Sequence, residues 1–191
     1  LTIGAINGVG SSLRWARDVL ALDEQRQAKA SDSDVYELIT AQAASSPPGA
    51  KGLVFLPYMA GERTPIWNPY ARGVFFGLTL GHTRAELFRA LLEGPAFAIR
   101  HTIEILEQDS GVEVQELRIG GAAARSAVWN QIIADVLNKP VIALSSSHIE
   151  VLGAAVLAGF GVGVYPTLAA GMTRVAETGR QFKPDPAAHA V

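Results

Sequence analysis

Between residues 73 and 158, short apolar runs alternate with longer segments in which apolar residues recur at helical spacing. Strand-like runs occur at "GVFFGLT", "ELRIGG" and "PVIAL", and helical patterns cover Thr83 to about Asp109, Ser126 to Leu137 and Ile149 to Ala158. Strands that alternate with helices favour a mostly parallel sheet covered by helices. The sequence therefore predicts an α/β fold.

The amino-terminal part of the chain carries the same two kinds of pattern. "LTIGAI" and Gly52 to Tyr58 are apolar and of strand length, whereas Ser12 to about Ala21 and Val35 to Ala44 have helical spacing. A polar stretch rich in Gln, Lys, Ser and Asp separates these two expected helices and interrupts the pattern. No internal repeat is present.

The helix expected from Thr83 has a defined start signal. Thr83 and Glu86 have the spacing of a capping box, in which the hydroxyl and the carboxylate each bind a backbone amide that the first turn leaves unpaired. Farther along, Gly94 and several alanines leave room for a neighbouring segment to approach closely. We expect this helix to pack tightly against another part of the core.

The composition narrows the classes of function. The 191 residues include 16 basic and 18 acidic ones, so the chain has no electrostatic footprint for nucleic acid or an anionic membrane surface. The absence of cysteine excludes disulfides, thiolate catalysis and cysteine-ligated zinc, and it fits a cytoplasmic protein. The most apolar window, Val151 to Tyr165, is broken by glycines and falls short of the ~20 residues that a membrane span needs.

Two glycine-containing junctions stand where a strand is expected to end and a helix to begin: "NGVGSS" and "GGAAARS". Ligands of α/β sheets bind at such junctions, because the first amides of a helix are unpaired and favour anions. A phosphate at the first junction and an adenosine at the second would account for both, and tight strand-to-helix packing is the alternative at each. Neither junction has the full glycine spacing of a dinucleotide-binding fold, and no P-loop motif is present.

The segment "GVFFGLTLGHTRAELFRALLE", residues 73–93, resembles the second signature of the FGGY carbohydrate kinases, which use ATP to phosphorylate sugars and polyols. The segments "FLPYMAGERTP", "PYARG", "RIGGAAARSAVWNQIIADV" and "EVLGAAVLAGFGVG" resemble the flanking blocks of that family in the same order. Within the family, "LPYMAGERTP" and "GSSLRWARD" are most similar to xylulokinases, with gluconate kinases close behind. The resemblance covers nearly the whole chain.

The resemblance implies an actin-like ATPase domain, which is a ribonuclease-H-like mixed sheet flanked by helices. Residues 1–191 would form the carboxy-terminal, nucleotide-binding domain of a two-domain enzyme and would begin after the first strands of that domain. The family's metal- and phosphate-binding turn, its second phosphate turn and its general-base aspartate have no match in this sequence. We therefore expect no catalytic residue and no metal ligand here, and no turnover by this chain alone.

The resemblance also implies a set of nucleotide-binding residues. Gly120 and Gly121 would let adenosine lie against bare backbone, with Ala122 extending that surface. Arg125 stands where glycerol kinases carry an asparagine that reaches the base, so a guanidinium stacked on adenine is expected instead. Gly10 and Arg14 match a nucleotide-contacting glycine and the polar residue that follows it by four positions. Arg14 would then face a phosphate, and a solvated surface arginine is the alternative.

The implied reaction transfers the γ-phosphoryl group of ATP, with Mg²⁺, to a sugar hydroxyl, and the best-matching substrate is D-xylulose, which would give D-xylulose 5-phosphate. Gluconate or another FGGY substrate is the alternative, because the sugar would be bound mainly by the other domain. A non-catalytic actin-like domain and a nicotinamide-binding domain are the rivals from other classes. The oligomeric state stays open: kinases of this kind are often homodimers, and the helix from Thr83 is one candidate surface.

The remaining polar and aromatic residues are expected to have mainly structural roles. Glu62 and Arg63 are expected to pair with each other or to line the interdomain cleft. Asp135 and Glu150 are expected to be solvated or helix-capping carboxylates. The histidines share no metal-ligand spacing, which argues against a zinc site; they are His82, His101, His148 and His189. The tryptophans are expected to pack in the core; they are Trp15, Trp67 and Trp129.

Overall fold

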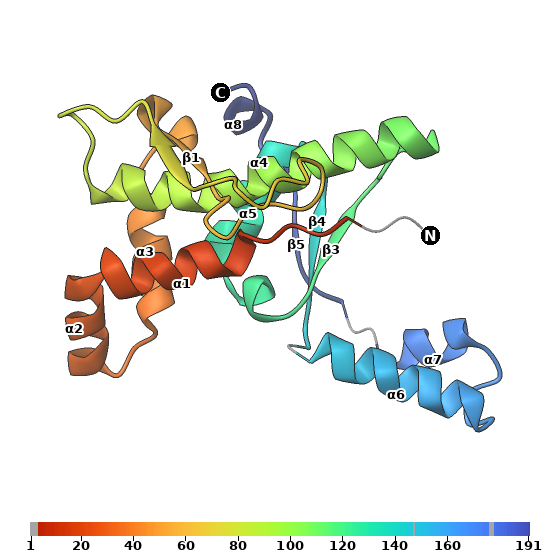
Figure 1. Ribbon diagram of the computed structural model, residues 1–191. Coiled ribbons are helices and arrows are strands. Elements are labelled where there is room, and N and C mark those ends of the chain that lie inside the picture. The colour runs from red at the N-terminus through yellow and green to blue at the C-terminus, as the bar shows by residue number, and fades with distance from the viewer. Residues whose placement is uncertain (1–3, 147, 176–177) are drawn as a thin grey trace.

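The structure is a computed structural model that describes residues 4–146, 148–175 and 178–191 (Figure 1). Its helices are α1 (Val9–Val19), α2 (Leu22–Ser31), α3 (Val35–Ala44), α4 (Arg84–Ser110), α5 (Ala127–Leu137), α6 (Ile149–Gly161), α7 (Leu168–Val175) and α8 (Pro186–His189), with short 3-10 turns η1 (Pro48–Gly52) and η2 (Ala122–Arg125). Its strands are β1 (Val54–Leu56), β2 (Val74–Phe76), β3 (Leu117–Ile119), β4 (Val141–Leu144) and β5 (Thr178–Phe182). Figure 1 shows α6 and α7 together at one end of the β3–β5 sheet and α8 at the other.

The helix predictions hold where the local signals are strong. Helices α3, α4 and α5 begin and end within a residue of the predicted bounds. Helix α1 begins at Val9, earlier than predicted, because the Ser12 hydroxyl does not cap the helix but donates to the Gly8 carbonyl at 2.6 Å, one turn back. The chain therefore enters α1 at Gly8, where a Cβ would lie 1.8 Å from the carbonyl oxygen of Pro57.

Helix α2 was not predicted, because its sequence is polar on nearly every side. Only Glu24 and Ala28 of this helix are buried. Glu24 accepts from Gln42 of α3 at 2.6 Å and pairs with Arg84 at the start of α4, which also binds Asp23 at 2.9 Å. Partners distant in the sequence therefore hold α2, and a local pattern cannot reveal them.

The strands form two small sheets rather than the predicted mostly parallel one. Strands β1 and β2 pair antiparallel, and the second sheet has the order β3-β4-β5 with β3 parallel and β5 antiparallel to β4. Among the described residues β3–β4 is thus the single parallel pair, and the sheet is mixed, as the family resemblance implies. Residues 1–3 of the predicted "LTIGAI" strand lie outside the described residues. Residues 4–6 are not in a strand, although Ala5 and Thr64 exchange two hydrogen bonds of 2.9 and 3.0 Å.

Helix α4 runs through the centre of the molecule, where α3, α5 and β1 pack on it (Figure 1). The predicted close approach occurs at Gly94, where a Cβ would lie 2.3 Å from the carbonyl oxygen of Phe55 in β1. On the side facing α5, the Trp129 indole donates to the carbonyl of Leu92 at 3.1 Å. Most residues from Glu86 to Ile103 are buried, so little of this stretch remains free for a partner.

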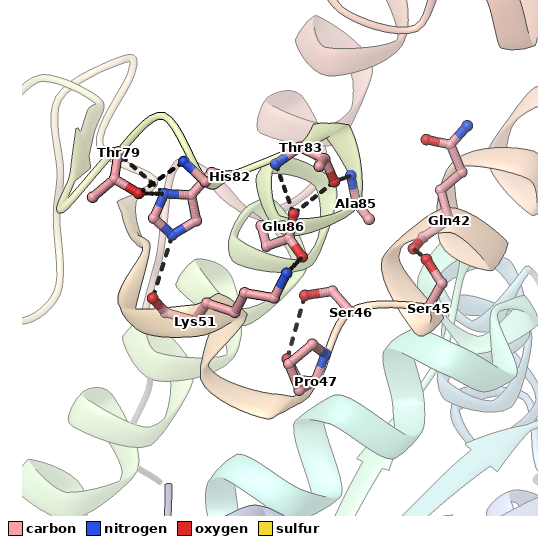
Figure 2. Close-up of polar contacts among 11 residues, drawn as sticks. Gln42, Ser45, Ser46, Pro47, Lys51, Thr79, His82, Thr83, Ala85 and Glu86 are labelled. Atoms are coloured by element: carbon pink, nitrogen blue, oxygen red, sulfur yellow. Dashed lines mark hydrogen bonds and ion pairs between the residues drawn. The ribbon is translucent and has the colours of Figure 1, made fainter.

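The predicted capping box is present at the start of α4 (Figure 2). The Glu86 carboxylate accepts from the amide and the hydroxyl of Thr83 at 2.7 and 2.6 Å and forms an ion pair with Lys51 at 2.8 Å. These three donors lower the pKa of Glu86 to about 2. The cap therefore also binds the turn η1.

The turn η1 contains left-handed backbone at Gly49, Ala50 and Lys51, with φ of 75°, 47° and 55°. Such backbone is unfavourable for residues other than glycine and persists where the surroundings hold it. Glu93 of α4 accepts from the Gly49 amide at 2.9 Å, and His82 contacts the Lys51 carbonyl at 3.3 Å (Figure 2). The two glutamates of the FGGY-like segment, Glu86 and Glu93, thus both fix this turn.

The described helices include none that combines the length and the apolar character needed to cross a bilayer. The cytoplasmic location inferred from the composition stays a prediction.

We expect Gly94→Ala to destabilise the protein by about 1–3 kcal/mol, because the added methyl group would collide with a carbonyl that cannot rotate away. Gly153→Ala is the matched control within α6, because a Cβ there meets nothing within 4 Å. The control should be stabilising by about 0.5–1 kcal/mol through helix propensity. Urea unfolding of both variants checks this, and equal effects would contradict the close approach.

The lowered pKa of Glu86 predicts that its contribution to the stability of the protein depends on pH. Because the pKa of Glu86 falls from 4.5 to about 2 on folding, its contribution to stability is complete above pH 4.5 and is lost as the pH falls toward 2. The difference in unfolding free energy between the wild type and Glu86→Gln should therefore shrink across that window. Glu104→Gln, which removes an exposed pair with Arg100, should show little such change when urea midpoints are measured from pH 6 to pH 2.5.

Candidate functional site

A pocket of about 380 Å³ opens beside the β3-β4-β5 sheet. Figure 1 shows that the end of the sheet where β4 leads toward α6 is the end from which the lining residues come. Strands β3 and β4 are parallel, so their carboxyl ends meet at this edge, which is where open α/β sheets bind ligands. The turn η2 follows β3, and Ser145 and Ser146 follow β4. The pocket is lined by Gly121, Ala124, Arg125, Ala127, Ala143, Leu144, Ser145, Ser146, Gly179, Arg180 and Phe182.

The two glycines that end β3 have different roles. A Cβ at Gly120 would lie 2.4 Å from the side chain of Ile149 in α6, so this glycine permits tight packing. Gly121 has φ 72° and ψ -157°, a conformation essentially restricted to glycine, and a Cβ there would meet nothing within 4 Å. Gly121 therefore presents bare backbone to the pocket. Gly120 instead serves the tight packing of the strand end against a helix, which was the alternative to ligand binding.

The turn η2 is held by the first residues of α5. The Ser126 hydroxyl caps that helix by accepting from the Trp129 amide at 3.2 Å. The fully buried Asn130 donates to the carbonyl of Ala124 at 2.9 Å, which fixes the pocket side of the turn. Asn130 could not be predicted from the sequence, because one amide within a helical pattern gives no signal of a bond to the preceding turn.

The opposite wall comes from β5, which contributes Gly179, Arg180 and Phe182. This strand was not predicted, because "TGRQF" has neither an apolar run nor a regular alternation. Two of the lining residues, Arg125 and Arg180, are cationic, and none of the lining residues carries a carboxylate. The site is therefore electropositive and suited to an anionic ligand.

Of the predicted nucleotide-binding residues, Gly121 and Arg125 line the pocket. Gly120 and Ala122 flank Gly121 in the chain but do not contribute to the lining. Gly10 and Arg14 lie on α1, outside the lining, and the Arg14 side chain is exposed. The contacts of all six residues with a nucleotide stay predictions.

Glu62 serves the loop near α1. Its buried carboxylate accepts from the backbone amides of Asn7 and Arg63 at 2.9 and 2.7 Å. Burial and the negative charge of Glu62 raise the pKa of Tyr58. The Arg63 side chain is exposed, and the ion pairs of the described residues do not join it to Glu62, so the first alternative, pairing of the two side chains, is wrong. The second alternative, that they line an interdomain cleft, stays a prediction.

Asp135 corrects another expectation, because it is neither solvated nor a helix cap. It is buried on α5 and accepts from Gln131 at 2.7 Å and from the amide of Asp185 at 2.9 Å. Glu150, by contrast, is exposed in the first turn of α6, as expected.

The three tryptophans divide between the core and the surface. Trp129 is buried and Trp15 packs against the core, but Trp67 is 69% exposed in a loop, so the packing prediction fails there. Within the part of the chain that the structure describes, no three His, Asp or Glu residues come together as a metal site would need.

Comparison with known proteins gives a consistent result. Residues 1–162 match the C-terminal domain of the FGGY family of carbohydrate kinases. A gluconokinase of Bacillus licheniformis is 39% identical over 164 residues, which are 86% of this chain and 31% of that protein. The chain thus spans about a third of the length of the curated relatives it matches.

Two solved structures share the fold. The xylulose kinase of Rhodospirillum rubrum superimposes with a TM-score of 0.81 at 37% identity, covering 98% of this chain and 36% of that one. The glycerol kinase of Plasmodium falciparum, solved with ADP, superimposes with a TM-score of 0.76 at 25% identity, covering 94% of this chain and 33% of that one. The actin-like fold predicted from the resemblance is confirmed.

Proposed function

The chain belongs to the FGGY family of carbohydrate kinases, and on this premise we propose that it forms the ATP-binding half of an enzyme that phosphorylates a sugar hydroxyl. The observation that carries the proposal is the pocket where bare backbone at Gly121 lies beside Arg125, with Arg180 on the opposite wall. The flat, unsubstituted backbone suits an adenine ring, and a guanidinium can stack on that ring. The net positive lining suits the phosphates.

Phosphoryl transfer depends on positioning and on charge stabilisation around the transferred group. This chain's residues would bind and orient the nucleotide. The family resemblance implies that Mg²⁺ is held by residues other than those of this pocket, whose lining has no carboxylate. The general base and the metal ligands would lie in a part of the enzyme outside residues 1–191.

We propose D-xylulose as the substrate, with D-xylulose 5-phosphate as the product. The 37% identity to a xylulose kinase at a TM-score of 0.81, together with the "LPYMAGERTP" segment, supports this choice. Gluconate is the second candidate, since a gluconokinase is 39% identical over 164 residues. The sugar would contact mainly the other domain. The family match of this chain therefore supports D-xylulose and gluconate alike.

Two rival functions would give different binding results. A non-catalytic actin-like domain would bind the same nucleotide without transferring its phosphoryl group, and a nicotinamide-binding domain would prefer NADH.

Homodimer formation is a further prediction, which sedimentation analysis can test.

The first prediction concerns nucleotide binding and uses calorimetric titration of the chain with ADP. Arg125→Ala should raise the dissociation constant about fivefold, because a stacked guanidinium contributes about 1 kcal/mol. Arg125 is exposed, so the substitution should leave the melting temperature unchanged. Arg26→Ala, an exposed arginine on α2, is the matched control. Binding of NADH in place of ADP would refute the proposal.

The second prediction concerns the sugar. The polypeptide that contains this chain, assayed with MgATP, should phosphorylate D-xylulose with a kcat/KM at least tenfold above that for gluconate or glycerol. A preference for gluconate would support the assignment as a sugar kinase but would contradict D-xylulose as the substrate. Nucleotide binding without transfer to any sugar would favour the non-catalytic domain.

A further inference from the structure

Helix α5 holds the carboxy-terminal segment, residues 183–189, through two side chains on one face. The Gln131 amide donates both to the Asp135 carboxylate at 2.7 Å and to the carbonyl of Lys183 at 2.8 Å. The same Asp135 oxygen accepts from the amide of Asp185 at 2.9 Å. The His189 ring donates to the backbone carbonyl of Asp135 at 2.9 Å.

This attachment begins one residue beyond the pocket wall. Phe182 lines the pocket, and Lys183, which follows it, is the residue that Gln131 binds. Asp135 is only 7% exposed, so its bonds to Gln131 and Asp185 are shielded from competing water. The position of β5 is therefore fixed immediately next to the side chain that closes the pocket.

The sheet holds strand β5 along one side only, so this attachment adds a second constraint on the position of the strand. It is an edge strand that pairs with β4 alone among the described strands, and its register with β4 is irregular between Ile142 and Leu144. At that irregularity a Cβ on Gly179 would lie 2.8 Å from the Ala143 carbonyl oxygen, so the start of the strand lies close against β4. Figure 1 shows β5 running from the pocket end of the sheet to α8 at the other end.

We propose that Gln131 and Asp135 are positioning residues for the nucleotide pocket. They lock the carboxy-terminal segment onto α5 and thereby hold Arg180 and Phe182 of β5 across the pocket from η2, which the same helix holds through Asn130. One helix thus fixes both walls of the pocket. The inference rests on the proposed nucleotide-binding function. Neither residue lines the pocket, so both act through β5.

A positioning role predicts an effect on nucleotide affinity and not on the chemical step. When the wall is correctly placed in only a fraction of molecules, the apparent dissociation constant rises by the inverse of that fraction. Gln131→Leu removes both amide bonds, and Asp135→Ala leaves the Asp185 amide without its acceptor. We expect each variant to raise the dissociation constant of ADP and the KM for ATP about tenfold. The kcat at saturating ATP and the KM for sugar should stay within twofold of wild type.

The experiment measures ADP titrations, ATP kinetics and melting temperatures on the full polypeptide that contains this chain. Asp135→Asn keeps a side-chain oxygen as acceptor for the Asp185 amide and should restore affinity to within about twofold of wild type. Gln108→Leu and Asp109→Ala, both exposed near the end of α4, are the matched controls. Gln131 is partly exposed, so Gln131→Leu should fold even if Asp135→Ala does not.

The outcomes separate the two proposals. If the wild-type protein binds no ADP, the proposed nucleotide-binding function itself is contradicted. A wild type that binds ADP, with Gln131→Leu and any folded Asp135→Ala at wild-type affinity and only a lowered melting temperature, would leave the pair a purely structural role and overturn the inference. A tenfold loss of affinity in Gln131→Leu, with Asp135→Asn at wild-type affinity, would support it.

Discussion

The close approach of Gly94 in α4 to the carbonyl of Phe55 in β1 is the constraint around which the rest of the structure is arranged. Because no side chain separates the two segments, α4 packs directly against β1. The turn η1 immediately precedes β1, so this contact also brings η1 within reach of Glu86 and Glu93. Three left-handed residues in η1 are then tolerated because these carboxylates hold them in place.

This arrangement changes how the FGGY-like segment 73–93 is interpreted. Its glutamates do not face the pocket, and both bind the turn η1. Their low exposure strengthens these charge-assisted bonds, since water competes little for the donors. The segment that identifies the family most clearly therefore builds the scaffold, and the ligand site is built by α5 and the sheet.

Helix α5 connects that scaffold to the pocket. Trp129 bonds to α4, Asn130 to the turn η2, and Gln131 to the segment that follows β5. These three consecutive residues point to different sides of the helix because successive side chains are about 100° apart. A displacement of α5 relative to α4 would therefore move both walls of the pocket together.

The sequence by itself determined the elements that local chemistry specifies. The capping box of Thr83 and Glu86, the bounds of α3 to α5, the need for a small residue at Gly94 and the family all follow from residues close together in the chain. Only the tertiary structure decided the rest, because those features depend on partners far apart in sequence. Helix α2 forms with the help of Arg84, β5 adds to an edge of the sheet despite its polar sequence, and Asp135 is buried because it binds the segment near Asp185. The different roles of Gly120 and Gly121 also became visible only once Ile149 was in place, since the same dipeptide can serve packing or exposed backbone.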